Sequence, residues 1–456
     1  MENKIQDEVG HDAWGMYAAS VALCFLFGIT ADLGIGAYAT QQFANNPEKL
    51  KEQFPYLWGI KLGLALLFPF LIIGVGITKN WIEPTHTIPL SFLFWASLLT
   101  SFTQIGEFLR SYVRGMQDFK TDSYLSVLEK GLYVIGIGFL LFWGTDIYGF
   151  VYLRAGIWVI TCGTVFYFLS KIIGFQRPVW RIKEWGKTLN SSIAFSILLI
   201  LASVNDKIDQ VLLQSLSGDK VTGLYAGAYR WLDAAFMFLW IVMPFFFARF
   251  AYLIRDYPAQ QKLFQLGQLL TAVPLLFVSL FVFFHGEKLF FLFGKSTPEE
   301  IAEMTKILKI LFAGGAIYSV FSIFDNLMTA TGFTRQVNVI LCVAILQNVV
   351  LNVIFIPKYG AEASAWATVS SYCTMASGYI WIMHKSMPIQ TPWLQMTKIG
   401  LIFGLTATGF YALTQTALLW YTQTLLAVGL YAILILVFRL VPREVRAQVL
   451  GLIGRK

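Results

Sequence analysis

The sequence has few charged residues. Only 13% of its 456 residues are Asp, Glu, Lys or Arg, whereas 57% are hydrophobic and 16% are aromatic. Soluble domains carry about 25% charged residues, so this composition excludes a soluble globular protein. Long uncharged apolar stretches are instead typical of chains that cross a lipid bilayer.

Residues on which enzymes and metal sites depend are also scarce. The four cysteines form no CxxC pair, and the four histidines show no metal-ligand spacing. Gly294, Lys295 and Ser296 imitate the end of a phosphate-binding loop, but the glycine required five residues before Gly294 is replaced by Leu289. We therefore expect no enzyme activity, no catalytic residue, no metal and no cofactor.

What the chain does contain is a series of long apolar segments. A helix needs about 20 mostly apolar residues to cross the hydrocarbon core of a bilayer. Only helices or closed barrels satisfy their backbone groups in lipid, and segments of this length are typical of helices. The sequence predicts thirteen membrane-spanning helices, at about 15–40, 55–78, 88–113, 122–143, 147–174, 189–215, 220–247, 264–284, 303–330, 336–355, 360–384, 396–414 and 418–438.

The loops between these segments differ in charge. Alternate loops and the C-terminal tail carry 21 Lys and Arg residues, whereas the opposite loops carry six. Loops rich in Lys and Arg remain in the cytoplasm, so we expect a cytoplasmic C-terminus and an N-terminus outside. The net charge of +8 would suggest a nucleic-acid partner in a soluble protein. Here it is explained by topology, and we expect no nucleic-acid partner.

An internal repeat divides the chain into two lobes. Residues recur in the same order at offsets of 208 to 211, as in the pairs Gly15 and Gly223, Tyr17 and Tyr225, Ala18 and Ala226, and Cys162 and Cys373. Such repeats share one orientation when each contains an even number of helices. The helix that opens the second repeat has no counterpart after Met1, so we expect the first lobe to lack its first helix.

The repeat and the loop charges together predict five regions. These are an N-lobe of five spans (1–174), a cytoplasmic interfacial linker (175–188), a C-lobe of six spans (189–386), two additional spans (387–440) and a basic cytoplasmic tail (441–456). The linker is predicted to lie on the membrane because its basic residues alternate with Trp180 and Trp185.

Charged residues inside the predicted spans are the candidates for function, because each costs about 2.5–3.5 kcal/mol at a helix centre. Arg230 and Asp233 lie three residues apart and can pair, as can Glu107 and Arg110. Asp206 and Asp209 share one helix face, which favours a proton or sodium site.

Lys130 and Arg154 project from consecutive helices. The alternative is that all these charges are buried ion pairs that fix helix packing. Lys61, six residues from a cytoplasmic helix end, is expected to extend its ammonium to the membrane surface.

Three stretches of the chain resemble a known family. They are Gly15-Met16-Tyr17 through Ala31-Asp32-Leu33-Gly34-Ile35-Gly36, Asn205-Asp206-Lys207-Ile208-Asp209 through Gly223-Leu224-Tyr225, and Gln347-Asn348 through Ala365-Trp366-Ala367-Thr368-Val369. Together they resemble the Wzx-like polysaccharide flippases of the multidrug/oligosaccharidyl-lipid/polysaccharide exporter superfamily.

The resemblance implies an all-α membrane protein with two pseudo-symmetric lobes around a central cavity, plus a terminal helix pair. It also implies flipping of a polyprenyl-diphosphate-linked oligosaccharide by alternating access, driven by an ion gradient, in the bacterial cytoplasmic membrane. The product would serve surface polysaccharides such as lipopolysaccharide O-antigen or capsule. A polysaccharide polymerase and glycosyltransferases are the expected protein partners.

A diphosphate-linked glycan needs a hydrated cavity with fixed positive charge. We expect Lys130, Arg154 and Arg230 to supply that charge, and Asp206, Asp209, Asp233 and Glu107 to pair with them or bind a coupling proton or sodium ion. The alternatives are an exporter of lipid II or of drugs from the same superfamily and, more remotely, a glycan-processing enzyme or a membrane scaffold.

Overall fold

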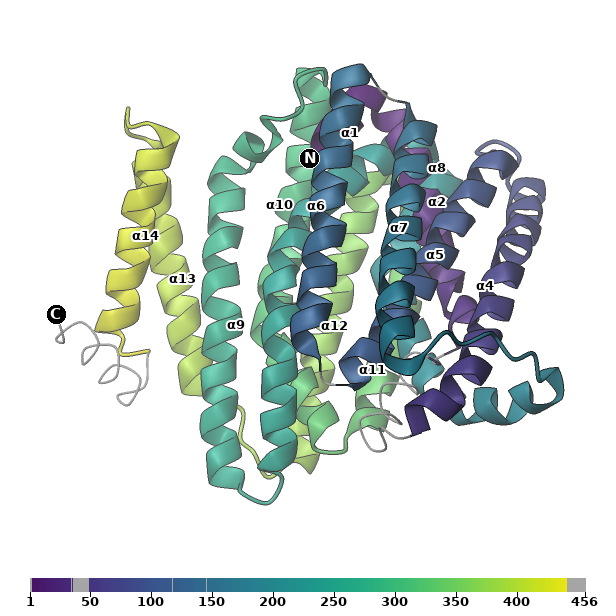
Figure 1. Ribbon diagram of the computed structural model, residues 1–456. Helices are drawn as coiled ribbons and strands as arrows, with labels where there is room; N and C mark the ends of the chain where they lie inside the picture. Colours follow the sequence, from purple (N-terminus) through teal and green to yellow (C-terminus); the bar gives the residue numbers. More distant parts are fainter. Residues whose placement is uncertain (1, 34, 36–48, 117, 145, 441–456) are drawn as a thin grey trace, which may run out of the picture. The chain divides into compact units, whose positions relative to one another are not determined.

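The computed structural model describes residues 2–33, 35, 49–116, 118–144 and 146–440, and all regular structure in these ranges is helical (Figure 1). The elements are α1 (Glu2–Val9), α2 (His11–Phe27), the 3-10 helix η1 (Gly28–Ala31), α4 (Lys49–Ile82), α5 (Leu90–Gly115), α6 (Phe119–Trp143), α7 (Ile147–Ile173), α8 (Ile182–Tyr252), α9 (Tyr257–His285), the 3-10 helix η2 (Gly286–Phe290), α10 (Pro298–Ala330), α11 (Thr334–Tyr359), α12 (Ala361–Ser386), α13 (Trp393–Thr414) and α14 (Trp420–Val437).

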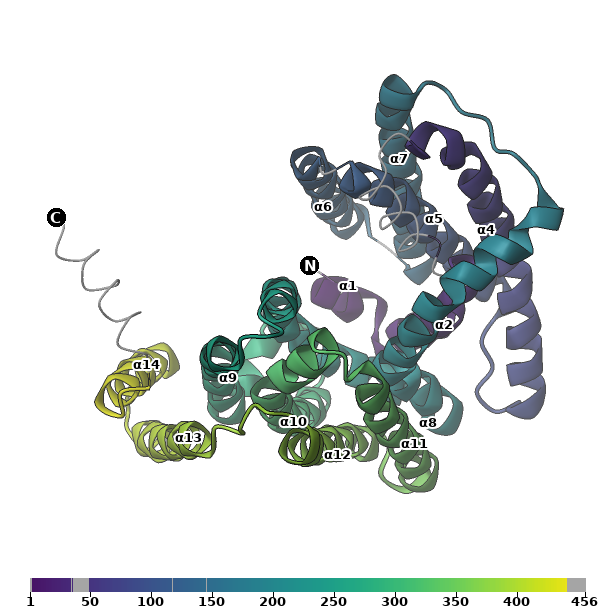
Figure 2. The ribbon, with the colours of Figure 1, turned by 90° about the horizontal axis from the view of Figure 1, so that it is seen from below.

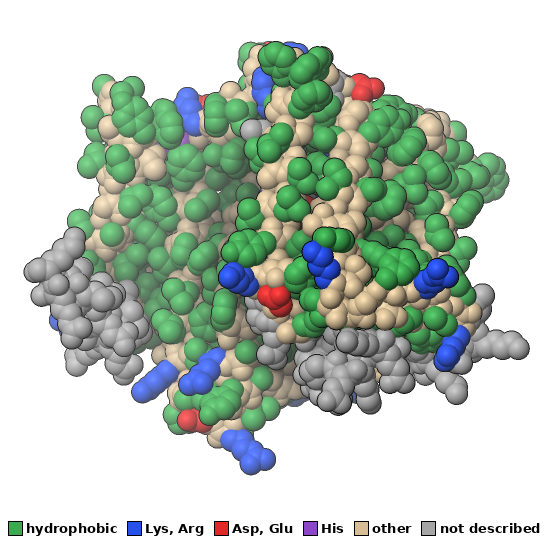
Figure 3. All heavy atoms as spheres, viewed as in Figure 1, with side chains coloured by type: hydrophobic (Ala, Val, Ile, Leu, Met, Phe, Trp, Pro, Cys, Tyr) green, Lys and Arg blue, Asp and Glu red, His purple; other side chains and the backbone are tan. Residues whose placement is uncertain are grey.

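Nine helical segments within the described ranges are long and apolar enough to cross a membrane. Their flanks carry large exposed hydrophobic side chains such as Trp81 and Phe142, and Figure 3 shows hydrophobic side chains over most of the visible helix surface. The prediction of an all-α, multi-pass membrane protein is confirmed. Three further predicted spans correspond to α2, α5 and α12, which lie outside this set. Helix α2 is short, α5 carries Glu107, Arg110 and Arg114, and α12 is rich in small and hydroxyl residues.

Several predicted helix boundaries lie within three residues of those in the structure. The spans predicted at 122–143 and 147–174 correspond to α6 and α7. Both helices begin after an aspartate whose carboxylate accepts a backbone N–H of the first turn, Asp118 for α6 and Asp146 for α7.

Two predicted spans differ from the structure. The helix predicted at 15–40 ends at Phe27 and continues into η1, while residues 36–40 lie outside the described ranges. The spans predicted at 189–215 and 220–247 are parts of one element, α8, which bends at Gly218, where φ is +84°. Glycine suits this position because other residues disfavour positive φ.

The chain groups into two compact units. Unit 1 contains 1–226 with the short segments 292–296 and 356–361, and unit 2 contains 227–291, 297–355 and 362–456. These units group residues by proximity rather than by the internal repeat. The predicted lobe boundaries at 174 and 189 therefore stay a prediction, and the predicted tail at 441–456 lies outside the described residues.

In unit 1, α5 packs between α4 and α7, and α6 packs on α7 (Figures 1 and 2). One of its hydrophobic clusters contains four aromatic residues, Phe54, Trp58, Phe108 and Tyr112, each in ring contact with two of the others. Such close aromatic packing leaves little space inside this part of the helix bundle.

In unit 2, α9 and α10 form the most extensive helix pair, and α13 and α14 pack together beside α9 (Figures 1 and 2). The hydroxyl of Tyr431 on α14 donates a hydrogen bond of 2.9 Å to the carbonyl of Val273 on α9. The terminal helix pair implied by the family resemblance is thus present as α13 and α14.

The segment between α7 and α8 packs against α4. The backbone N–H of Val179 donates to the carbonyl of Pro55 at 2.9 Å, and the indole rings of Trp180 and Trp185 lie 6.3 Å apart. A Cβ on Gly63 of α4 would lie 2.4 Å from the Trp185 ring. The two tryptophans therefore contribute to packing in unit 1, and the predicted position of this linker on the membrane surface stays a prediction.

Candidate functional site

The ammonium of Lys61 is fully buried in unit 1 and forms an ion pair with the carboxylate of Asp32. Asp32 follows η1 directly, where the helix path of α2 has ended, and the next residue, Leu33, has a φ of +46°. The prediction that Lys61 extends to the membrane surface is wrong. The break after α2 brings a carboxylate within reach of Lys61 inside the protein, which removes the reason to extend outward.

Helix α5 supplies the other groups around this ion pair. The side-chain carbonyl of Gln104 lies 3.5 Å from the Lys61 ammonium nitrogen, and the ring centroid of Phe108 lies 5.9 Å from it. Glu107 is a second carboxylate that acts on Lys61 electrostatically. Asp32, Lys61 and Gln104 therefore form a small polar centre in which oxygen atoms converge on one positive charge.

A second charged cluster lies where α5 faces α6. Arg110 contacts three carboxylates, with distances of 2.8 Å to Asp122, 3.3 Å to Glu107 and 3.4 Å to Glu129. Arg114 adds a 3.2 Å contact to Glu107. Two of these contacts cross between the helices, so the cluster fixes how α5 and α6 pack.

Two of the residues predicted for the site, Glu107 and Lys130, belong to this cluster. Glu107 pairs with both arginines, and Lys130 forms a 3.1 Å ion pair with Glu129. The Lys130 side chain is 71% exposed, whereas Arg110 is buried. The cluster thus has a buried centre at Arg110 and its most exposed cation, Lys130, at the edge.

At the start of α6, the chain is fixed by its own cap outside the predicted membrane region. The hydroxyl of Thr121 donates to the Asp118 carboxylate at 2.6 Å and its backbone N–H donates at 3.1 Å. These bonds hold the pKa of Asp118 below its ordinary value. The cap sets where α6 begins and therefore the positions of Asp122 and Glu129 one and three turns later.

Arg154, the second predicted cation, is surrounded by aromatic rings. Its guanidinium donates to the hydroxyl of Tyr17, and its carbon lies 5.6 Å from the ring centroid of Tyr133 and 5.9 Å from that of Phe150. The hydroxyl of Tyr133 donates in turn to the Glu2 carboxylate. Arg154 on α7 therefore links α1, α2 and α6 through cation–π and hydrogen-bond contacts.

The acids predicted on α8 within unit 1 have separate partners. Asp206 forms a 3.2 Å ion pair with Lys207, and the buried Asp209 accepts a 3.0 Å hydrogen bond from the hydroxyl of Tyr225. Tyr225 lies beyond the bend at Gly218, so this bond joins the two arms of α8. Whether the two carboxylates form a proton or sodium site stays a prediction.

The third predicted cation, Arg230, and Asp233 lie in unit 2, on the second arm of α8. Both side chains are half-buried. Their predicted pairing stays a prediction. Unit 2 also contains the half-buried Asp325 of α10, whose carboxylate accepts a 3.1 Å hydrogen bond from the Thr329 hydroxyl.

The Gly294–Ser296 segment binds a carboxylate of the chain itself. The backbone N–H groups of Gly294 and Lys295 donate to the two oxygens of Asp7 at 3.0 and 2.8 Å. His11 contacts the Ser296 hydroxyl at 3.0 Å, and Lys295 pairs with Glu8. We call these contacts the α1 clamp.

Two ionisable groups of the α1 clamp have shifted pKa values. The hydrogen bond from Lys295 lowers the pKa of Glu8, and the hydrogen bond to Asp7 raises the pKa of Lys4. The polar start of the chain was expected to be a loop, whereas the structure has the helix α1 there. The helix is amphipathic, and Ile5, Gln6 and Asp7 form its buried part.

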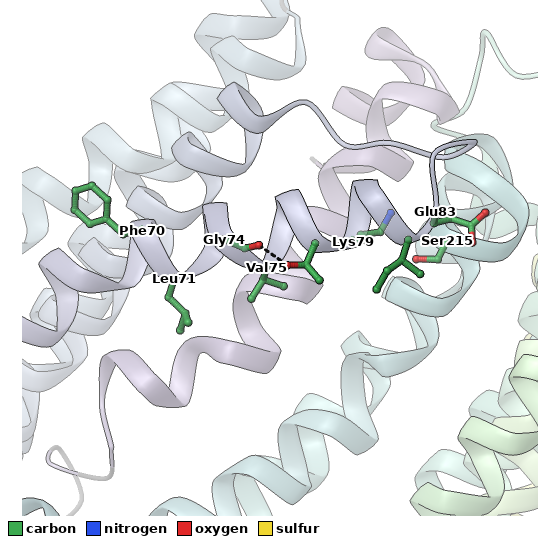
Figure 4. Close-up of a pocket in the computed structure, with 9 residues that line it drawn as sticks. Phe70, Leu71, Gly74, Val75, Lys79, Glu83 and Ser215 are labelled. Carbon is green, nitrogen blue, oxygen red and sulfur yellow. Dashed lines mark hydrogen bonds between the residues drawn. The ribbon is translucent and has the colours of Figure 1, made fainter.

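A groove of about 770 Å³ runs along α4 and ends at Ser215 (Figure 4). Phe70, Leu71 and Val75 line one part of it, and Lys79 and Glu83 lie at the other end. The Lys79 ammonium already donates to the His86 carbonyl at 2.9 Å. With one engaged cation and one acid, the groove does not supply the positive charge predicted for the site.

Within the described ranges, no group of three or more His, Cys, Asp or Glu residues is arranged to hold a metal ion. The four cysteines are all free thiols, and only Cys24 is fully buried.

Comparison with protein families gives one match. Residues 5–246 match the family described as "Polysaccharide biosynthesis protein". A search of curated proteins gives no match. The matched range includes the charged groups described above, except for Glu2, Lys4, residues 292–296 of the α1 clamp and Asp325.

Solved structures extend the similarity over the whole chain. The lipid II flippase MurJ in an inward closed conformation aligns with a TM-score of 0.75 at 16% identity, covering 96% of this chain and 95% of that one. An inward-facing multidrug resistance MATE family transporter of the MOP superfamily aligns with a TM-score of 0.62 at 13% identity, covering 83% and 94%. A MOP superfamily transporter from Pyrococcus furiosus aligns with a TM-score of 0.58 at 15% identity, covering 84% and 90%. Such identities establish a shared fold.

Proposed function

Because the chain belongs to the polysaccharide biosynthesis protein family, we propose that it flips a polyprenyl-diphosphate-linked oligosaccharide from the cytoplasmic to the outer leaflet of the bacterial cytoplasmic membrane. The family match confirms the resemblance found from the sequence motifs. It is also the observation that carries the proposal, because it associates this chain with polysaccharide synthesis. The fold shared with transporters supports translocation as its part in that process.

The substrate's chemistry explains why such a protein retains charge among its apolar helices. A diphosphate is a strong anion, and charge-assisted hydrogen bonds from arginine hold it with defined geometry. Arg154 and Arg230 are our candidates for this contact, with Lys130 as an accessory cation at the edge of the α5–α6 cluster. Arg154 is held by Tyr17 and two aromatic rings, which position its guanidinium.

Translocation requires that the substrate site opens to one side of the membrane at a time. By the predicted topology, the α1 clamp lies on the outer side, so its contacts would close that side. Opening would then require Asp7 to leave the N–H groups of Gly294 and Lys295. We propose that an ion gradient drives this cycle and that Asp206, Asp209, Asp233 and Glu107 are pairing or coupling groups. A polysaccharide polymerase and glycosyltransferases are the proposed protein partners.

Lipid II is the second candidate substrate. The alignment with the lipid II flippase covers nearly the full length of both chains and has a higher TM-score than the alignment with the MATE transporter. Lipid II shares the anionic diphosphate and the polyprenyl chain, so the same cations would serve it. The glycan therefore distinguishes the two candidates.

The test is to identify which lipid-linked precursor accumulates when the gene is removed. We expect a polyprenyl-diphosphate oligosaccharide to accumulate in the deletion strain while lipid II remains at its normal amount. Accumulation of lipid II would favour the second candidate, and unchanged amounts of both would contradict a flippase.

Complementation of the deletion strain tests whether Arg154 and Arg230 are needed for export. Arg154→Ala and Arg230→Ala should insert in the membrane but fail to relieve the accumulation, because each removes a cation proposed to bind the diphosphate. Arg255→Ala is the matched control, since Arg255 is an exposed arginine in a loop between α8 and α9. Full complementation by both Arg154→Ala and Arg230→Ala would overturn their assignment.

A further inference from the structure

The Lys61 ammonium occupies a position that has the features of a monovalent-cation site. A carboxylate oxygen of Asp32 and the side-chain carbonyl oxygen of Gln104 converge on it, and the centre is closed to solvent on the Lys61 side. Oxygen ligands of this kind suit hard cations. In this protein the positive charge between these oxygen atoms is the ammonium of Lys61, which is covalently attached to α4.

A tethered ammonium changes what the site can exchange. A bound sodium ion can leave and be replaced, whereas Lys61 cannot dissociate from the chain. The charge of the centre can therefore change only by gain or loss of a proton. Among the described residues, the charged groups that act on Lys61 are Asp32 and Glu107, and Glu107 is already engaged by Arg110 and Arg114.

We propose that Asp32 and Lys61 form the proton-binding pair of this transporter, with the Lys61 ammonium filling the place of a sodium ion, so that transport is coupled to protons and not to sodium. This proposal rests on the proposed transport function and names its coupling ion. One proton binds a carboxylate oxygen of Asp32 on one side of the membrane and leaves the same oxygen on the other. No other atom is gained or lost.

The position of the pair connects protonation to a conformational change. Asp32 lies at the break between η1 and residue 35, and Lys61 lies on α4. Protonation of Asp32 replaces an ion pair by a neutral acid next to an uncompensated ammonium. An unpaired charge inside a membrane protein is unfavourable, so the two segments would move apart and let Lys61 reach water or another anion.

The experiment measures ion binding by the purified full-length protein in detergent, without glycan. Its thermal unfolding is followed in sodium chloride and in choline chloride at equal ionic strength. For the native protein we expect no sodium-specific change in the unfolding temperature. For Lys61→Ala, which leaves Asp32 and Gln104 without their cation, we expect sodium to raise the unfolding temperature by about 2 °C or more relative to choline.

Two further variants control for folding. Asp32→Asn/Lys61→Gln replaces the pair by two neutral amides of similar size and should fold without any response to sodium. Lys61→Met keeps the length of the side chain, and should respond to sodium as Lys61→Ala does. A sodium-specific stabilisation of the native protein that Asp32→Asn abolishes would overturn the proposal, as would the lack of any sodium response in both single Lys61 variants.

A measurement of export in cells distinguishes this proposal from the flippase assignment. If export occurs in sodium-free medium and stops when a protonophore collapses the proton gradient, both proposals stand. If export occurs but requires sodium, the coupling proposal fails and the flippase assignment stands. If the deletion strain accumulates no lipid-linked glycan, the flippase assignment fails, while the sodium-binding arm still decides whether Lys61 occupies a cation position.

Discussion

Gly15 of α2 and Gly223 of α8 form a reciprocal close contact. A Cβ on Gly15 would lie 1.7 Å from the carbonyl oxygen of Asp219, and a Cβ on Gly223 would lie 1.9 Å from the carbonyl oxygen of His11. The two glycines are 208 residues apart, and so are His11 and Asp219. Both glycines belong to the predicted internal repeat, and the two helices approach at them as closely as their backbones allow.

Alanine at either glycine should force this crossing apart. We expect Gly15→Ala and Gly223→Ala to lower the unfolding temperature and to reduce export, because the added methyl would meet a backbone carbonyl that has no side-chain freedom to move. Gly138→Ala is the matched control, since a Cβ there meets nothing within 4 Å. An effect of Gly15→Ala and Gly223→Ala no larger than that of Gly138→Ala would contradict the close contact.

The reciprocal contact also predicts how the stability losses of Gly15→Ala and Gly223→Ala combine. Once one alanine has separated the helices, a second one meets less resistance. The double variant should therefore lose less stability than the sum of the two single variants, which a double-mutant cycle measures. Strict additivity would show that the two glycines do not share one contact.

Substitution at the centre of the α5–α6 cluster should destabilise the protein much more than substitution at its edge. Arg110→Ala removes the buried cation that Asp122 and Glu129 share, and removal of one partner of a buried pair costs about 3–5 kcal/mol. Lys130→Ala removes an exposed partner of Glu129, which is worth about 0–1 kcal/mol. The free energy of unfolding of each variant measures the difference, and equal losses would contradict the network as described.

The α1 clamp should depend on Asp7 and on pH. Asp7→Ala removes the acceptor of two backbone N–H groups, so a protease site introduced in the 292–296 segment should be cut faster in this variant than in the native protein. Asp12→Ala is the matched control, because Asp12 is an exposed aspartate in the first turn of α2. Equal cleavage rates in the two variants would exclude Asp7 as the residue that holds the segment.

The pH window of the clamp follows from the shifted pKa values of its two outer groups. The pKa of Glu8 is lower in the folded protein, so its contribution is present above the ordinary value of 4.5 and is lost as pH falls through the lower folded value. The pKa of Lys4 is raised, so its contribution is present below the ordinary value of 10.5 and is lost as pH rises through the higher folded value. Cleavage in the introduced site should therefore be slowest between about pH 4.5 and 10.5.

The aromatic surroundings of Arg154 should also be measurable. Tyr17→Phe keeps the ring but removes the hydroxyl that accepts from the guanidinium, which should cost about 1–3 kcal/mol of stability. Tyr411→Phe is the matched control, because Tyr411 on α13 is exposed. If Tyr17→Phe unfolds at the same temperature as Tyr411→Phe, the hydroxyl does not hold Arg154.

Hydropathy placed several helix ends within a few residues, both for helices with a side-chain cap and for α13 and α14, which have none. Asp118 and Asp146 cap α6 and α7, and both boundaries were predicted within a few residues. The break of α2 at Phe27 was missed, because the apolar composition continues past it while the backbone turns at Gly28–Ala31. Hydropathy reports burial in lipid and does not report a change in backbone direction.

Glu107, Lys130 and Arg154 were singled out from the sequence, but most of the residues that they contact were not predicted. Glu107 and Arg110 lie three residues apart, so helix geometry alone predicted their pairing. The Lys61–Asp32 pair joins residues 29 positions apart across a broken helix, and the Arg154 contacts join four helices. Such contacts depend on how helices pack in three dimensions, which local spacing does not determine.

The central claim is that this protein moves a lipid-linked glycan between leaflets, and leaflet accessibility tests it most directly. Spheroplasts of strains with and without the gene would be treated with a membrane-impermeant reagent that oxidises sugars, and the labelled fraction of polyprenyl-diphosphate oligosaccharide would be measured. We expect the labelled fraction to fall to near zero without the gene and to recover when the native chain is restored, but not with Arg154→Ala. An unchanged labelled fraction in the deletion strain would contradict the account.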